Sequence, residues 1–122
     1  MSGNALKKIR LELGRTKEQP EGNPRCGYEF WAPLTADGHL DEAAYKAVKA
    51  ECRVHRFWEG AMPEHGHLQH LGPDRWVFSY APGKDDDEPA FKLDKHRFEV
   101  GEYVSLTEHD GVTRPFRIVA IT

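Results

Sequence analysis

Hydrophobic and polar residues alternate along most of this 122-residue chain, a pattern typical of β-strands. It is clearest at residues 8–13, where Ile9, Leu11 and Leu13 are separated by charged residues. Because successive side chains on a strand point to opposite faces, these three are expected to form one buried row, in a core shared with Val104, Leu106 and Ile118. The same criterion predicts further strands at 27–32, 53–58, 66–71, 75–80, near residue 91, 102–108 and 113–121.

Turn and helix signals divide these strands. Gly72-Pro73-Asp74 and Asp110-Gly111 each lie between two predicted strands and favour hairpins. Residues 42–51 are mostly Ala, Lys and Glu, which favour a helix, and Asp41 can cap its start. Helical spacing places Tyr45, Val48 and Cys52 on the apolar side of this helix. Lys46 and Lys49 lie on the opposite, polar side.

The pattern therefore predicts a mainly β (α+β) fold. We expect one domain over residues 1–122, built as a small antiparallel β-barrel or sandwich of about eight strands with one short helix at about 41–52. Alternation alone does not distinguish the closed barrel from the open sandwich. Residues 1–5 are expected to be flexible, and like charges predict that the acidic segment 82–89 is a mobile loop.

Composition and charge narrow the functional classes. The formal charge is −3, from 17 Lys and Arg against 20 Asp and Glu, which disfavours a dedicated DNA-binding domain but permits a local basic patch. No apolar run has the length of a secretion signal or a membrane span, so we expect a cytoplasmic protein with no membrane partner. The only cysteines, Cys26 and Cys52, are expected to be buried thiols.

Two segments near the end of the chain carry a resemblance. Residues 97–106 place an aromatic and a Gly-acid pair before a strand, and residues 116–121 form a final apolar strand. This arrangement resembles the closing strands of SH3-like, OB-like and PUA-like small β-barrels. The chain as a whole also resembles a group of small bacterial proteins without an assigned activity. These resemblances imply a compact barrel and no particular catalytic residue.

Basic and aromatic residues interleave on several predicted strands. Together they could stack bases and contact phosphates, as single-strand-binding surfaces do. Alternatively, the rings belong to the core and the arginines flank it. The candidate ligand or nucleic-acid surface consists of Arg53, His55, Arg56, Trp58, Arg75, Trp76 and Arg117.

Metal and catalytic patterns are weaker. Cys52 with His55, and His67 with His70, have the spacing of two zinc-ligand pairs. On a strand, however, His67 and His70 project to opposite faces, so we expect no metal and no other cofactor. The chain has no nucleophile elbow, phosphate loop or dinucleotide motif, which disfavours an enzyme.

The sequence thus favours a small β-barrel module that acts by binding and not by catalysis. Its partner would be another protein, a small ligand or a second copy of the chain. One alternative is a barrel that binds RNA or single-stranded nucleic acid through the arginine and aromatic surface. Another is a small hydrolase-like enzyme with a pocket at the barrel mouth.

Overall fold

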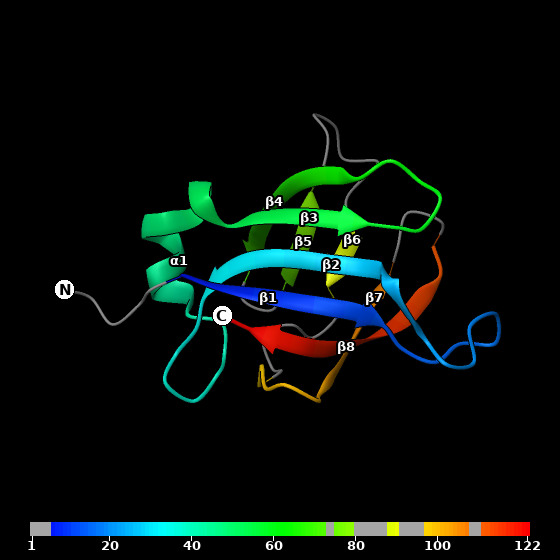
Figure 1. Ribbon diagram of the computed structural model, residues 1–122. Coiled ribbons are helices and arrows are strands. Elements are labelled where there is room, and N and C mark those ends of the chain that lie inside the picture. Colours follow the sequence, from blue (N-terminus) through cyan, green and yellow to red (C-terminus); the bar gives the residue numbers. More distant parts are fainter. Residues whose placement is uncertain (1–5, 73–74, 80–87, 91–96, 108–110) are drawn as a thin grey trace.

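The computed structural model describes residues 6–72, 75–79, 88–90, 97–107 and 111–122. In these ranges the chain forms eight antiparallel strands and one short helix (Figure 1). The strands are β1 (Leu6–Leu13), β2 (Asn23–Pro33), β3 (Arg53–Phe57), β4 (Glu64–Gly72), β5 (Arg75–Ser79), β6 (Glu88–Ala90), β7 (Tyr103–Thr107) and β8 (Thr113–Ile121). The helix α1 (Glu42–Val48) continues into a 3-10 turn, η1 (Lys49–Glu51).

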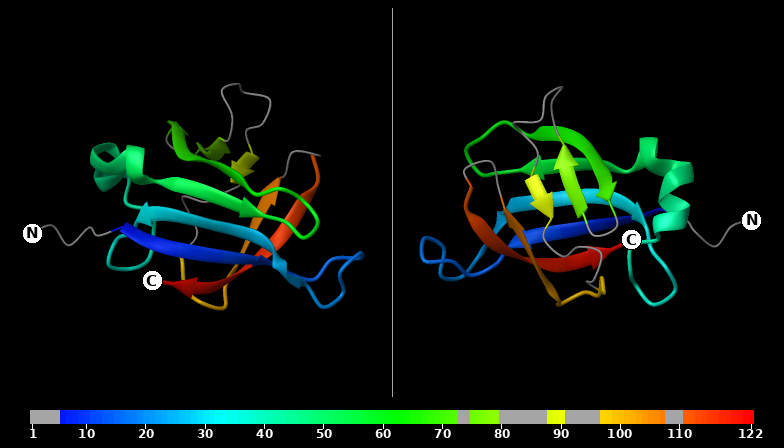
Figure 2. Two further views of the ribbon diagram at one scale, coloured as in Figure 1. Left: turned by 45° about the horizontal axis from the view of Figure 1, so that its top comes forward. Right: turned by 180° about the vertical axis from the view of Figure 1, so that it is seen from behind.

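The sheet closes into a barrel. Each strand pairs with the next one along the chain, and β8 pairs back onto β1, with Ile9 opposite Ile121 and Leu13 opposite Phe116. Figure 2 shows the sheet curling around a common interior from two sides. The choice between barrel and sandwich is thereby settled in favour of the barrel. This eight-stranded meander differs from the five-stranded Greek-key barrel of the OB fold.

The interior is filled with apolar side chains. All six residues expected in the shared core are buried: Ile9, Leu11, Leu13, Val104, Leu106 and Ile118. Aromatic rings occupy the space between them. The rings of Phe30 and Phe116 lie near Phe78 and Tyr28 respectively, with both centroid separations at 5.2 Å. Such close ring contacts are typical of a well-packed protein core.

The helix covers one end of the barrel, the end at which β1 begins and β8 ends (Figures 1 and 2). The carboxylate of Asp41 accepts a hydrogen bond from the backbone N–H of Ala44 at 3.0 Å, which confirms the predicted cap. Tyr45 is buried and donates its hydroxyl to the carbonyl of Leu68 at 2.9 Å. Lys46 and Lys49 are exposed, so the helix presents its apolar side to the barrel as predicted.

Several element boundaries differ from the prediction. β2 begins at Asn23 and not at residue 27, because Asn23 pairs with Leu13 beyond a register shift whose extra residues lie in β2. Glu88 and Pro89 belong to β6, where they pair with β5, and not to the acidic loop. Residues 1–5, the segment 82–87 and Phe91 lie outside the described residues. Cys26 and Cys52 are both buried and free, as expected. In the described part of the chain, no helix is long and apolar enough to cross a bilayer.

Candidate functional site

The residues of the predicted binding surface lie in separate places. Along β3, Arg53 and His55 point outward, whereas Arg56 alternates to the other side. Arg56 lies at the barrel end opposite α1, with its guanidinium 4.3 Å from the ring centroid of Trp58. Trp76 is only 3% exposed, beneath Tyr45 of the helix. The prediction had pooled side chains from both faces of one sheet.

The remaining two predicted residues add nothing to this surface. Arg117 is exposed on β8 and lines a separate hollow of about 270 Å³ together with Arg15, Glu12 and Glu21. That hollow carries both signs of charge. The side chain of Arg75 lies outside the described part of the structure. Arg53 and His55 are therefore the two predicted residues around which a common site can be built.

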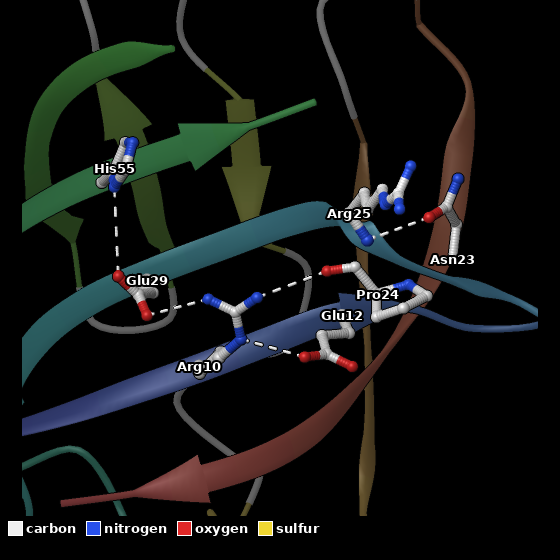
Figure 3. A network of polar contacts seen from close by, with 7 residues as sticks. All are labelled: Arg10, Glu12, Asn23, Pro24, Arg25, Glu29 and His55. Atoms are coloured by element: carbon white, nitrogen blue, oxygen red, sulfur yellow. Dashed lines mark hydrogen bonds and ion pairs between the residues drawn. The ribbon is translucent and has the colours of Figure 1, made fainter. Parts of the chain in front are cut away.

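A row of polar side chains crosses four strands on the outer face. Backbone pairing places Arg10 opposite Glu29, Glu29 opposite His55, and His55 opposite His65. We call these four residues the histidine row. Figure 3 shows Arg10 donating to the Glu29 carboxylate at 2.9 Å, while the other oxygen of Glu29 lies 3.9 Å from Nδ1 of His55. The rings of His55 and His65 stack, with centroids 4.7 Å apart.

Arg10 is the fixed point of this row. It also donates to Glu12 at 2.9 Å and to the carbonyl of Pro24 at 3.3 Å. Partial burial by itself would lower the pKa of Arg10, but hydrogen bonds and charge attraction from Glu12 and Glu29 outweigh it and raise that pKa above its ordinary value. The guanidinium of Arg10 is thus already paired with carboxylates of the protein, and this pairing positions Glu29 next to His55.

A second row lies next to the first. Trp31 on β2 is opposite Lys8, and Arg53 on β3 is opposite His67 on β4. The guanidinium carbon of Arg53 is 6.0 Å from the ring centroid of Trp31, at the outer limit of a cation–π contact. Arg53 and His67 are both exposed, and no carboxylate within the described ranges pairs with either. The second row therefore offers positive charge that is still available.

Two adjoining hollows follow these rows. The first has a volume of about 350 Å³ and is lined by side chains of both rows; we call it the strand hollow. The second, of about 530 Å³, lies between α1 with η1 and β4; we call it the helix hollow. The two hollows share His67. The polar and aromatic residues of the strand hollow are Trp31, Arg53, His55, His65 and His67, and those of the helix hollow are Tyr45, Lys46, Lys49, His67, Gln69 and His70.

The lining of both hollows is free of Asp and Glu among the residues that the structure describes. Three permanent cations remain: Arg53, Lys46 and Lys49. Two carboxylates lie at the margins: Glu29 behind His55, and Glu42 with an oxygen 4.0 Å from Nε2 of His70. In a chain of net negative charge, this face is a local concentration of positive charge.

Two of the lining histidines have unsatisfied nitrogens. Three ring nitrogens are buried without a hydrogen-bond partner: Nε2 of His55, Nε2 of His70 and Nε1 of Trp76. The ring of His70 stacks on that of Trp76, with centroids 4.3 Å apart. Buried polar atoms are normally paired, because leaving one unpaired costs about 1–3 kcal/mol. These rings are held in place by stacking and not by hydrogen bonds, an arrangement that does not maximise stability.

The four candidate metal ligands do not converge. The thiol of Cys52 is buried and lies 3.5 Å from the carbonyl of Val48, within reach of a hydrogen bond. Burial raises the pKa of this thiol to about 11, so it stays protonated at neutral pH. His67 faces outward and His70 is half-buried against Trp76, on the opposite side of β4. Within the described ranges, no three His, Cys, Asp or Glu side chains form a metal-binding group.

The predicted ligand surface lacked Trp31, His65, His67, Lys46 and Lys49. The histidines could have been found, because residues two apart on a strand share a face. Arg53 with His55, and His65 with His67, are two such pairs on neighbouring strands. Trp31 and the lysines needed the register of β2 and the position of α1, which the sequence does not specify.

Comparisons with known protein families, with curated protein sequences and with solved structures give no match to this chain.

Proposed function

We propose that the protein is a binding module that takes an anionic ligand on the outer face of β2, β3 and β4. One observation carries this proposal: two adjoining hollows are lined by Arg53, Lys46 and Lys49 and by no described carboxylate. Cations without partners in a hollow bind anions by charge-assisted hydrogen bonds, which are about twice as strong as neutral ones. The exposed position of Arg53 keeps its five donors accessible.

The size of the hollows supports a ligand with a phosphate or a similar compact charged group. The strand hollow, at about 350 Å³, is at the small end of the range for ligand sites. Its walls combine a guanidinium, imidazoles and an indole. Arginine recognises phosphate oxygens with two parallel hydrogen bonds, and imidazole N–H groups donate to the same oxygens.

Binding fits the chain better than catalysis. Among the described residues, aromatic rings pack against one another inside the barrel, which disfavours a large internal pocket there. Cys26 and Cys52 are both buried, and the raised pKa of Cys52 disfavours a thiolate nucleophile. The committed ion pairs of Arg10 further indicate that the histidine row is a rigid support for a ligand.

A titration tests the proposal. Pyrophosphate is added to the 122-residue chain while the heat of binding is measured at about 20 mM and 200 mM salt. We expect binding that weakens as salt increases, because exposed charges are screened. Arg53→Ala is expected to lower the affinity at least tenfold, since a lost charged hydrogen bond costs about 1.5 kcal/mol or more.

Arg117→Ala is the matched control. It removes the same charge from an exposed strand position, but on β8 and away from both hollows. Its affinity is expected to equal that of the unmodified chain. Absence of binding, or an equal loss in both variants, would contradict the proposal.

A further inference from the structure

Taking the proposed function as its basis, we infer that the anionic ligand is a single-stranded nucleic acid. It lies across β2, β3 and β4, with a base on Trp31 and phosphates on Arg53 and on the lysines of α1 and η1.

The indole is the first reason. Trp31 sits on the outer face of β2 and is only half-buried, although a tryptophan of a small barrel gains more free energy from full burial. It is placed beside Arg53 and forms one wall of the strand hollow. A free phosphate makes no use of an indole ring, whereas every nucleic-acid base has a flat face that stacks on one. A base together with its phosphate accounts for both side chains.

The second reason is the extent of the surface. Neighbouring strands are about 4.8 Å apart, so β2 to β4 alone span about 10 Å, and the helix hollow continues beyond β4. His67 belongs to both hollows, so the lining connects Trp31 and Arg53 with Lys46 and Lys49. A single phosphate group occupies one hollow. A ligand with repeated phosphates fits two hollows in series.

The third reason is the polar edge of the histidine row. His55 and His65 stack on each other with an interplanar angle of 9°, and both line the strand hollow. Because one face of each ring is turned toward the other ring, the row presents imidazole edges, whose N–H groups can donate to a phosphate or to the edge of an unpaired base. The base edges of a duplex are paired with each other, so they are less open to such contacts.

The number of cations gives a quantitative expectation. Three permanent positive charges line the two hollows: Arg53, Lys46 and Lys49. For single strands, the logarithm of the binding constant falls with the logarithm of salt concentration by about 0.7 per neutralised phosphate. Three contacts predict a slope of about −2. This shallow slope suits a chain whose net charge is −3.

The experiment measures fluorescence anisotropy of a labelled eight-nucleotide single strand, with the same strand as a duplex and with the mononucleotide as competitor. We expect the octamer to bind at least tenfold more tightly than the mononucleotide and than the duplex. Trp31→Leu is expected to lower the octamer affinity at least fivefold, because stacking on one ring is worth about 1 kcal/mol or more. Trp31→Phe keeps an aromatic face and is expected to retain most of the affinity.

Charge variants provide a second measurement that does not depend on the indole. Arg53→Ala and Lys49→Ala are each expected to reduce the salt slope from about −2 to about −1.4. Arg117→Ala is expected to leave the slope unchanged. Thermal unfolding checks that each variant is folded, and the lysine is exposed on η1, so its replacement leaves the core intact.

The outcomes separate the two proposals. If pyrophosphate, the mononucleotide and the octamer bind equally and all depend on Arg53, the anion site stands and the nucleic-acid inference is overturned. Equal affinity for duplex and single strand, or full octamer binding by Trp31→Leu, also overturns it. If none of the three ligands binds, both proposals fail.

Discussion

Gly27 offers a sharp test of how tightly β1 and β2 are packed. It lies in β2, paired with Glu12 of β1 and with Phe57 of β3. A Cβ atom at this position would overlap the carbonyl oxygen of Leu11 and lie 3.0 Å from its carbonyl carbon. Both atoms belong to the backbone of a paired strand and cannot rotate away. We therefore expect Gly27→Ala to be among the most damaging single-methyl additions.

The magnitude follows from the displacement that the methyl group requires. Nonbonded heavy atoms rest about 3.5 Å apart, so the two strands must separate by more than about 1 Å. That shift stretches the flanking ladder hydrogen bonds, each worth about 1 kcal/mol, and adds overpacking strain of about 1–3 kcal/mol. We expect a loss of about 3–5 kcal/mol. A chain of 122 residues has a free energy of unfolding of about 6–18 kcal/mol, so the loss is a large fraction of it.

Urea denaturation, followed by tryptophan fluorescence, measures this change as a shift of the midpoint at constant slope. Gly60→Ala is the matched control, because nothing lies within 4 Å of a Cβ at that position and only its φ of +82° opposes a side chain. We expect the control to lose about 1–2 kcal/mol. The reasoning about strand packing is refuted if Gly27→Ala is no more destabilising than Gly60→Ala.

Three further predictions concern the helix end of the barrel. Tyr45→Phe removes the hydroxyl that donates to the carbonyl of Leu68, so it should lower the free energy of unfolding, measured in urea, by about 1–2 kcal/mol. An unchanged midpoint of urea unfolding would contradict a stabilising role of this buried hydrogen bond. Asp41→Ala removes the helix cap and should cost about 1 kcal/mol, whereas Asp41→Asn, which keeps a capping oxygen, should cost less in the same assay. The thiol of Cys52 ionises near pH 9 in the unfolded chain and near pH 11 in the folded chain, so between these pH values the unfolded chain holds fewer protons and the free energy of unfolding falls. Between pH 8 and pH 11, Cys52→Ala should therefore lose up to about 3 kcal/mol less of its free energy of unfolding than the unmodified chain does. Equal losses in the two proteins would contradict the raised pKa.

Strict alternation made the fold predictable. Charged residues alternate with Ile9, Leu11 and Leu13, so the three apolar side chains share one face of the strand, and that face is buried. Asp41 precedes a run of helix-favouring residues, and its carboxylate caps the helix as that pattern predicts. The start of β2 was missed, since Asn23 and Pro24 have turn chemistry and become strand only through pairing with β1. Local preference was overridden by a partner strand that is distant in sequence.

The site was predictable only in part, for a related reason. Side-chain type suggested an arginine and aromatic surface, but the alternation along β3 sends Arg53 outward and Arg56 to the barrel end. Trp76 is covered by α1, whose position depends on packing between elements. His65 joins the site through its register with His55. A one-residue change of register would move every side chain of a strand to the other face, so residue types alone could not assemble the site.

The closure of the barrel has a consequence for how the protein is made. β1 is paired on one side by β2 and on the other by β8, which is synthesised after the other seven described strands. At about 5–20 residues per second, the 108 residues between Leu13 and Ile121 take about 5–20 s to synthesise. Throughout that interval the nascent chain carries a strand with one open side. Lys7, Lys8 and Arg10 give that strand positive charges, which discourage newly made copies from joining side to side before the last strand arrives.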